Sequence, residues 1–219
     1  MELGTRTPDA GLLIIGHRGF AAAFPDNSLA GVQAAITAGA DGVEVDVRRC
    51  ADGTWVCHHD RTRAGRPVAA WALAELRRQG VPTLADVADA VPADRWLYVE
   101  VKPLPASDLR PGVPALAELL ERRLAFSRVI SSDGTVLAAV AGALPAVSRS
   151  LVFDVIPERL PADVELSPEH RLVESLVGRG RPLHPWTVDD AARMRELAAL
   201  RVGSITTNDP VLALEVLRG

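Results

Sequence analysis

Residues 12–60, LLIIGHRGFAAAFPDNSLAGVQAAITAGADGVEVDVRRCADGTWVCHHD, contain three short apolar runs that end in, or alternate with, polar residues. A short apolar run that stops at glycine and charge is typical of a buried strand with polar groups at its carboxyl end. Because side chains alternate across a strand, the two acidic residues of the second run share one face and its valines the other. The stretch therefore predicts a phosphate and metal site built from adjacent strands, with the side chains of His17, Arg18, Glu44, Asp46 and His59.

The rest of the chain alternates between apolar runs typical of strands and amphipathic stretches typical of helices. We predict strands at residues 12–15, 42–48, 54–58, 96–101, 128–131, 148–153, 164–167, 182–187 and 203–207. We predict helices at residues 29–38, 71–79, 82–90, 113–124, 135–142, 169–178, 189–200 and 210–217. Asp26 or Asn27 is placed to cap the first helix, and Gly39 to end it.

Short links between strands and helices imply parallel strands with crossover helices. Eight such units in 219 residues are the size of a compact α/β fold, the (β/α)8 or TIM barrel. A doubly wound sheet is the alternative, but no GxGxxG sequence follows the first strand, which weighs against a dinucleotide-binding fold. No linker or repeat divides the chain, so we expect a single domain over residues 1–219. In a barrel of this kind the active site lies at the carboxyl ends of the strands.

The composition is that of an ordinary globular protein, with 48% hydrophobic and 24% charged residues. A formal net charge of −4 gives no reason to expect nucleic-acid binding. No apolar stretch approaches the roughly 20 residues of a membrane span, so we expect no stable membrane insertion. The polar N-terminus lacks the apolar centre of a signal peptide, which predicts a cytoplasmic protein. The oligomeric state does not follow from the sequence.

The two cysteines, Cys50 and Cys57, flank a hairpin turn that we predict at Asp52-Gly53. A two-residue turn places Cys50 opposite Trp55 and not opposite Cys57, so we expect no disulfide between the two cysteines. The sequence has no Cys or His spacing that is typical of a zinc site.

Three acidic residues, Glu44, Asp46 and Glu100, would supply hard oxygen ligands from adjacent strands. Such a set favours Mg2+ or Ca2+ over zinc, which prefers nitrogen and sulfur. The alternative is that they are solvated charges at strand ends, or partners in ion pairs. Because unpaired acids on the inward face of a barrel are costly to bury, we expect them to hold one divalent cation.

Arg18 and Lys102 would complement a substrate phosphate, although they can also pair with the same carboxylates, and the two roles are compatible. His17 and His59 suit a general acid and base because imidazole titrates near neutral pH. Two histidines at strand ends beside a metal site favour catalysis over a structural role. The other three histidines, which we expect to lie outside the site, are His58, His170 and His184.

A series of short motifs runs along the chain in a fixed order. The motifs are His17-Arg18-Gly19, Pro25-Asp26-Asn27-Ser28, Glu44-Val45-Asp46, Asp52-Gly53, His59-Asp60, Pro82-Thr83-Leu84, Glu100-Val101-Lys102, Ile130-Ser131-Ser132, Trp186-Thr187-Val188 and Ile205-Thr206-Thr207-Asn208-Asp209-Pro210. Each is weak alone, but the ordered set is highly specific and covers nearly the whole chain. In these motifs the sequence strongly resembles the glycerophosphodiester phosphodiesterases.

The resemblance implies a TIM-barrel enzyme that hydrolyses glycerophosphodiesters, its small-molecule substrates, to an alcohol and sn-glycerol 3-phosphate. It also implies roles for single residues. These are His17 and His59 as the acid and base, Arg18 and Lys102 as the phosphate clamp, Glu44, Asp46 and Glu100 as the ligands of a divalent metal, and Trp186 as a wall of the substrate pocket.

The sequence departs from the family pattern in three places. The usual PENT is Pro25-Asp26-Asn27-Ser28, which keeps the turn and capping chemistry. The usual ITD-x-P ending reads Thr206-Thr207-Asn208-Asp209-Pro210, a change at the strand end that we expect to spare catalysis. The segment between Asp60 and Pro82 is shorter than the insertion that family members carry there, which bears on how the glycerol site is closed.

Two other functions remain open at this point. One is a lysophospholipase D-type or other phosphodiesterase of the same fold, for which the apolar loop 19–24 would be a lipid-facing candidate. Packing of that loop on the barrel rim is the simpler interpretation. The other is a non-catalytic barrel that binds a phosphate ligand, which the loss of a histidine or a metal ligand would indicate. The sequence shows no such loss.

Overall fold

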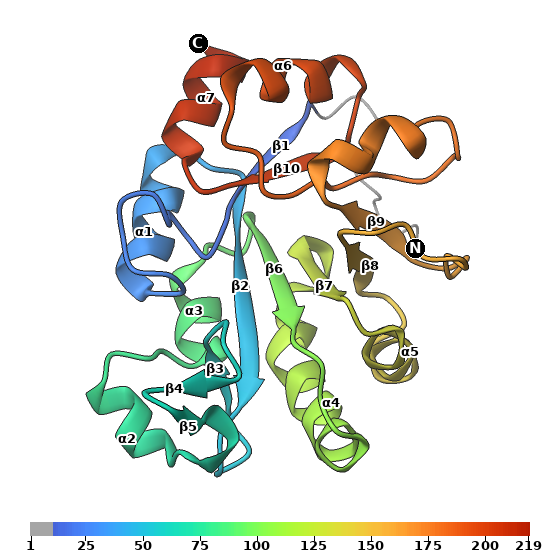
Figure 1. Cartoon of the computed structure of the whole chain (residues 1–219). Helices are drawn as coiled ribbons and strands as arrows, with labels where there is room; N and C mark the ends of the chain where they lie inside the picture. The colour runs from blue at the N-terminus through green and yellow to red at the C-terminus, as the bar shows by residue number, and fades with distance from the viewer. Residues whose placement is uncertain (1–10) are drawn as a thin grey trace.

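The structure, a computed structural model, describes residues 11–219. Its main sheet has parallel strands in the order β10-β1-β2-β6-β7-β8-β9, and a short strand, β3, pairs antiparallel with β2 (Figure 1). The strands are β1 Leu13–Gly16, β2 Gly42–Arg49, β3 Trp55–Cys57, β6 Trp96–Val101, β7 Ser127–Ser131, β8 Ser148–Phe153, β9 Glu165–Pro168 and β10 Ser204–Thr207. A separate hairpin is formed by β4 Thr62–Arg63 and β5 Arg66–Pro67.

The barrel closes between β9 and β10 through a segment that is not a regular strand. In this segment Leu183 forms a parallel bridge with Leu166 of β9, and its carbonyl accepts a hydrogen bond of 2.8 Å from the Gly203 backbone. The prediction of a regular strand at residues 182–187 is therefore wrong, because two prolines there have no N–H to donate to the hydrogen-bond ladder of the sheet. The segment still fills the eighth position, so the (β/α)8 barrel is confirmed.

Helices cover the outside of the sheet (Figure 1). They are α1 Leu29–Ala38, α2 Leu73–Arg78, α3 Leu84–Ala90, α4 Ala106–Leu120, α5 Gly134–Ala143, α6 Ala191–Ala199 and α7 Pro210–Arg218, with short 3-10 helices η1 Val68–Ala70, η2 Glu121–Phe126 and η3 His170–Ser175. None of the helices within residues 11–219 combines the length and the apolar character that crossing a bilayer requires.

Two of the predicted helices differ from the structure. The helix predicted at residues 113–124 begins at Ala106 and includes two prolines, because its packing through Val113, Leu116 and Leu120 outweighs the lost hydrogen bonds. The helix predicted at residues 169–178 is reduced to η3, at whose start the His170 N–H donates to the Trp186 carbonyl at 2.9 Å. Residues 154–164, which join β8 to β9, contain no helix.

The hairpin between β2 and β3 is shifted by one residue from its predicted register. Trp55 lies opposite Arg49, and the Cys50 N–H donates to the Thr54 carbonyl at 3.0 Å. The loop is therefore three residues long rather than two, with Gly53 at its end at φ 75°. The prediction that Cys50 lies opposite Trp55 is therefore wrong. Both cysteines are buried free thiols.

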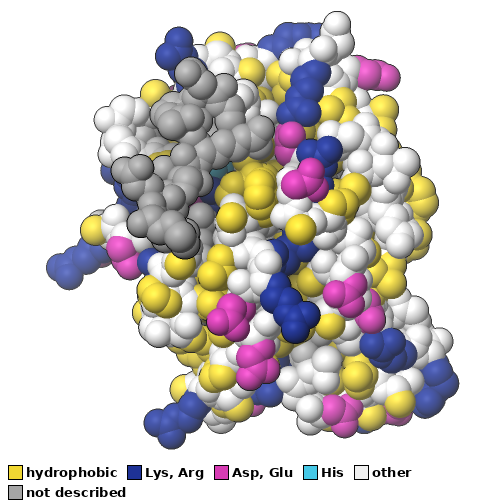
Figure 2. Space-filling view, turned by 180° about the vertical axis from the view of Figure 1, so that it is seen from behind, with side chains coloured by type: hydrophobic (Ala, Val, Ile, Leu, Met, Phe, Trp, Pro, Cys, Tyr) yellow, Lys and Arg dark blue, Asp and Glu magenta, His cyan; other side chains and the backbone are white. Residues whose placement is uncertain are grey.

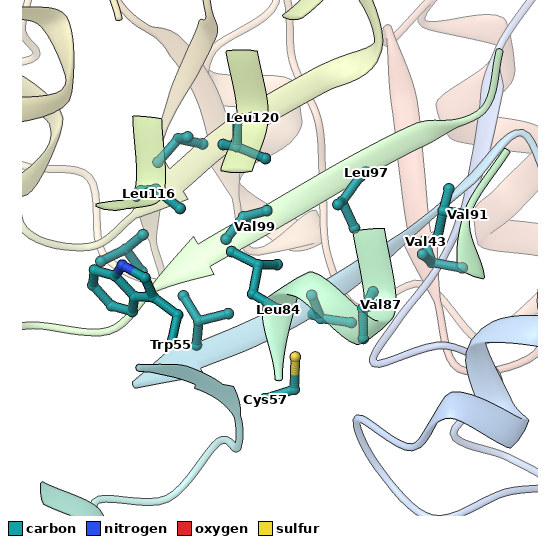
Figure 3. Packing of buried hydrophobic residues seen from close by; sticks show 14 of the residues in the cluster. Val43, Trp55, Cys57, Leu84, Val87, Val91, Leu97, Val99, Leu116 and Leu120 are labelled. Carbon is teal, nitrogen blue, oxygen red and sulfur yellow. The ribbon is translucent and has the colours of Figure 1, made fainter. Parts of the chain in front are cut away.

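Alternation along β2 decides which side chains enter the core. Val43, Val45 and Val47 are fully buried and pack outward against the helices. Figure 3 shows Val43 among residues of β6, α3 and α4, with the Trp55 indole at one end of the cluster. A second cluster joins β1 and β10 to α6 and α7. The acidic residues of β2 are left on the opposite, inward face.

On the side of the molecule drawn in Figure 2, Lys and Arg side chains are scattered among acidic and apolar groups outside the grey region. Residues 1–10, which include most of the stretch on which the signal-peptide expectation rests, lie outside the described residues.

The amino-terminal end of the barrel interior contains a buried polar cluster. Arg128 Nη2 lies 2.6 Å from Glu165 Oε2, and His184 Nε2 lies 3.2 Å from the same oxygen. The other ring nitrogen of His184 lies 3.1 Å from Arg128 and 2.9 Å from Ser204 Oγ, and Arg128 also donates to the Tyr98 hydroxyl. This cluster stands where a barrel is usually filled by layers of apolar side chains.

The buried cluster makes stability depend on pH. Burial, followed by the Arg128 charge, lowers the pKa of His184 to about 4. The unfolded chain binds a proton at this residue below about pH 6.5, whereas the folded chain does not until the pH is far lower. The free energy of unfolding should therefore fall between about pH 6.5 and 4, by an amount on the order of 3 kcal/mol.

Urea unfolding at a series of pH values measures this dependence. The His184→Gln variant, which has no group to titrate at this position, should show a shallower fall over the same range. Equal slopes for the two proteins would show that His184 does not remain neutral in the folded state.

Candidate active site

Three carboxylates meet on the inward face of two neighbouring strands. The parallel register of β2 and β6 places Asp46 beside Glu100, and Glu44 lies two residues before Asp46 on the same face. One oxygen of each carboxylate lies within 4.8 Å of the others. Glu44 and Asp46 are only 2% and 0% exposed. The structure thus brings together the three predicted metal ligands, and it does so inside the barrel.

Basic and amide groups partly compensate these negative charges. Lys102 Nζ lies 2.6 Å from Asp46 Oδ1 and also 2.6 Å from Glu100 Oε1. Arg18 Nε lies 3.1 Å from Asp46 Oδ2, which also accepts a hydrogen bond of 2.9 Å from Asn27. The predicted phosphate clamp therefore sits directly on the carboxylates. Within residues 11–219, the ion pairs from Lys102 and Arg18 reach Asp46 and Glu100 but not Glu44.

The pKa values in the cluster diverge. Burial, followed by repulsion from Asp46 and Glu100, raises the pKa of Glu44 well above its ordinary value. Burial also raises the pKa of Glu100, against the opposing charge of Lys102. Burial alone would raise the pKa of Asp46, but the Lys102 charge and the Asn27 hydrogen bond hold it below its usual range. Asp46 is the most strongly ionised of the three.

The loop after β1 is built from two close backbone approaches. A side chain on Gly16 would meet the Gly19 carbonyl oxygen at 2.2 Å, and one on Gly19 would meet the Gly31 backbone at 2.6 Å. Gly19 and Arg18 both have positive φ, at 89° and 51°. This conformation aims the Arg18 N–H at Glu44 Oε2, 3.1 Å away. The loop thus contributes a backbone donor as well as the guanidinium.

Asp26 and Asn27, which precede the N-cap of α1, contact residues of the site and do not cap the helix. Ser28 is the N-cap and accepts a hydrogen bond from Gly31, so the predicted capping by Asp26 or Asn27 is wrong. Asp26 pairs with Arg18 at 2.5 Å, and Asn27 exchanges two hydrogen bonds with Asp46. The shorter serine side chain reaches the helix N–H groups, which frees the two preceding residues for the carboxylate cluster. Gly39 ends α1 at φ 102°, as predicted.

His17 lies at the edge of the carboxylate cluster. Its Nε2 is 3.9 Å from Glu44 Oε2, and its Nδ1 is 2.7 Å from Asn208 Oδ1. Burial, partly offset by the Asn208 hydrogen bond, lowers the pKa of His17. An open cavity of about 580 Å³ is lined by His17, Arg18, Asn208 and Asp189, among others. The cavity lies on the Asn208 side of His17, and none of the three carboxylates lines it.

His59 follows β3 and is more exposed than His17. Its Nδ1 lies 2.8 Å from Asp60 Oδ1, and its side chain is 42% exposed. The backbone carbonyl of His59 accepts a hydrogen bond of 2.8 Å from Arg48 Nε. Arg48 shares the inward face of β2 with Asp46. Sequence reasoning missed its contact with His59, although its spacing from the two acids was the available signal.

Trp186 and the other three histidines each have polar partners outside the carboxylate cluster. Trp186 donates its indole N–H to the Ser167 carbonyl at 2.8 Å, so its ring faces are what remain for a ligand. His58 Nε2 lies 3.3 Å from the Thr62 carbonyl, and His170 Nε2 lies 3.4 Å from Glu169. His184 belongs to the buried cluster at the other end of the barrel. Sequence reasoning missed Asn208 and Asp189; the altered ITD-x-P ending was the signal for Asn208, and Asp189 directly follows the Trp186-Thr187-Val188 motif.

The donor set fits a hard divalent cation. Its ligands are three carboxylates, the type that Mg2+ and Ca2+ prefer. Glu44 Oε1 is buried and has no hydrogen-bond partner within the described residues. A bound cation would satisfy this oxygen and relieve the repulsion that raises the pKa of Glu44. With Arg18, Lys102 and two imidazoles around it, such a site can bind and polarise a phosphate ester.

Comparisons with known proteins agree with this geometry. Residues 17–131 match the Glycerophosphoryl diester phosphodiesterase family. A glycerophosphodiester phosphodiesterase of Caldanaerobacter subterraneus subsp. tengcongensis is 28% identical, over 94% of this chain and 98% of its own length. A Mycobacterium tuberculosis protein named "Probable glycerophosphodiester phosphodiesterase 2" is 30% identical, over 94% of this chain and 91% of its own.

Two solved structures share the fold. A glycerophosphodiester phosphodiesterase from Parabacteroides distasonis has a TM-score of 0.82 at 22% identity, covering 94% of this chain and 97% of its own. An Oleispira antarctica phosphodiesterase, solved in complex with the product sn-glycerol-3-phosphate, has a TM-score of 0.82 at 20% identity, with coverage of 94% and 97%. With its motifs, its barrel and its inward carboxylates, the chain belongs to the glycerophosphoryl diester phosphodiesterase family.

Proposed function

We propose that this protein hydrolyses glycerophosphodiesters to an alcohol and sn-glycerol 3-phosphate, with one divalent cation, Mg2+ or Ca2+. The observation that carries the proposal is the cluster of Glu44, Asp46 and Glu100, with His17 and two cationic side chains at its edge. The sn-glycerol-3-phosphate bound by the Oleispira antarctica enzyme supports the same substrate class.

The three carboxylates would hold the cation, which would stabilise negative charge on the phosphoryl oxygens. Arg18 and Lys102 would complement the same phosphate, Arg18 with a planar fork and Lys102 as a point charge. Both cations already lie against the carboxylates, so a phosphate entering the site meets them without a large movement.

His17 and His59 would move the protons. One imidazole takes the proton of the glycerol 2-hydroxyl, whose oxygen attacks phosphorus while the bond from phosphorus to the leaving alcohol breaks. The other imidazole donates a proton to that alcohol, and a cyclic glycerol phosphate remains. Water then opens the ring with the roles of the histidines reversed. Because the hydroxyl is tethered beside phosphorus, the first step gains from proximity.

The apolar loop after β1 does not favour the lysophospholipase alternative. Phe20 packs against the core cluster, and its ring lies 5.9 Å from that of Phe24. This supports packing on the barrel rim. Assays of glycerophosphodiesters, bis(p-nitrophenyl) phosphate and lysophospholipids test the proposal. Turnover of lysophospholipids alone would favour the alternative, and turnover of none would favour a binding protein.

Removal of the metal should abolish activity. EDTA should stop the hydrolysis of glycerophosphocholine, and added Mg2+ or Ca2+ should restore it. Glu44→Gln removes one charged ligand and should mimic chelation, with a loss of kcat/KM of about a hundredfold or more, equivalent to about 2.7 kcal/mol. Glu196→Gln, the same exchange at an exposed ion pair with Arg193 on α6, serves as a matched control. Full turnover by the chelated enzyme contradicts the metal assignment.

The substrate's own hydroxyl should be required. A 2-deoxy analogue of the glycerol moiety should bind as a competitive inhibitor without being hydrolysed. His17→Ala and His59→Ala should each lower kcat by about a hundredfold to ten-thousandfold, the usual range for lost acid-base catalysis. Rapid hydrolysis of the deoxy analogue would mean that water attacks phosphorus directly, and the two-step route would be wrong.

A further inference from the structure

We infer that Asn208 and Asp189 are positioning residues that fix the proton of the neutral His17 imidazole on Nδ1 and leave Nε2 facing the carboxylates. The inference deepens the proposed function and rests on it, because it concerns how His17 works in that site. It is carried by a chain of hydrogen bonds from Asp189 through Asn208 to His17.

Asp189 determines which way the Asn208 amide points. The Asn208 backbone N–H donates to Asp189 Oδ1 at 2.8 Å, and its side-chain Nδ2 donates to Asp189 Oδ2 at 2.6 Å. An ionised carboxylate only accepts hydrogen bonds, so the amide nitrogen must face it. The reversed amide would set an oxygen against a carboxylate oxygen. Asn208 Oδ1 therefore faces His17.

The orientation of the amide in turn determines the tautomer of His17. An amide oxygen has no hydrogen to give, so the 2.7 Å contact with His17 requires the proton to be on Nδ1. The other nitrogen, Nε2, is then unprotonated and lies 3.9 Å from Glu44 Oε2. Only this nitrogen faces the carboxylate cluster, so it is the one that would accept a proton from the substrate and return it.

The barrel itself supplies the positions of these groups. Gly16 at the end of β1 pairs with Thr207 at the end of β10, and the His17 N–H donates to the Thr207 carbonyl at 2.7 Å. Figure 1 shows these two strands side by side. Thr207 Oγ1 also donates to Asp189, at 3.0 Å, which ties the segment before α6 to the same strand end. The chain of contacts is thus assembled from three separate units of the barrel.

A direct test measures the tautomer. NMR of ¹⁵N-labelled histidine in the full chain with Mg2+, at about pH 8.5, two units above the ordinary imidazole pKa, distinguishes Nδ1–H from Nε2–H. His17→Gln identifies the signal. We expect Nδ1–H in the natural sequence and a shift toward Nε2–H in Asn208→Ala. Nε2–H in the natural sequence, or no change in Asn208→Ala, would overturn the inference.

Kinetics separate positioning from a structural role. Asn208→Ala should lower kcat by about ten- to a hundredfold, a part of the usual acid-base contribution, with KM changed by less than about threefold. Asp190→Ala is the matched control: it removes the N-cap of α6 beside Asp189 and should lower the unfolding midpoint without changing kcat or the tautomer. A fall in kcat that only follows the fall in the unfolding midpoint would contradict positioning.

A paired exchange provides the rescue. Asn208→Asp alone sets two carboxylates against each other and should lower kcat. Adding Asp189→Asn restores the pairing, because the new amide can donate to the new carboxylate, which still accepts from His17. The double variant should recover to within about tenfold of the natural kcat, since its His17 contact is kept. A double variant no better than the Asn208→Asp single would overturn the inference.

The NMR measurement of the tautomer and the measurement of kcat also separate this inference from the function on which it rests. If His17→Ala keeps full turnover, the acid-base function of His17 is wrong, whatever the tautomer. If His17→Ala is inactive but Asn208→Ala keeps both the tautomer and kcat, the function stands and the positioning inference is wrong.

Discussion

The burial of three carboxylates in one barrel mouth is the constraint on which the site depends. Carboxylates that are withdrawn from water and close together repel one another, and this repulsion, added to the burial, raises the pKa of Glu44. Lys102, Arg18 and the Asn27 amide all bind Asp46 and partly offset this repulsion. Within residues 11–219, the hydrogen bond that Glu44 accepts comes from the Arg18 backbone N–H and its Oε1 has no partner, so a bound cation would stabilise Glu44 most.

Strand register explains why these groups meet. Asp46 and Glu100 are paired residues of parallel neighbours, and both acids of β2 lie on its inward face. The same alternation sends the valines of β2 outward into the main core. A shift of one residue along the strand would exchange the two sets, burying acids under helices and placing valines in the mouth. Core packing and site geometry are therefore consequences of the same register.

The two ends of the barrel interior are both polar but differ in character. The carboxyl end gathers three carboxylates, with a cavity beside His17 at the edge of the cluster. The amino end encloses Arg128, Glu165 and His184 in direct contact with one another. At the amino end the charges of Arg128 and Glu165 balance each other beside a neutral imidazole, so no ligand is needed there. At the carboxyl end one buried oxygen of Glu44 has no hydrogen-bond partner within residues 11–219, which leaves it available to a cation.

The sequence by itself determined the alternation of strands and helices, the barrel, the family, and the inward faces that bear Glu44, Asp46, Glu100 and Lys102. These follow from local periodicity and from the order of short motifs. Sequence reasoning missed the irregular strand position at residues 182–187, the one-residue shift of the hairpin and the early start of α4. Two prolines account for the first difference, the hydrogen bonds of the loop for the second, and packing against the core for the third. Only the tertiary structure brought Asn208 and Asp189 to His17, because residues 191 positions apart meet only when β10 closes against β1.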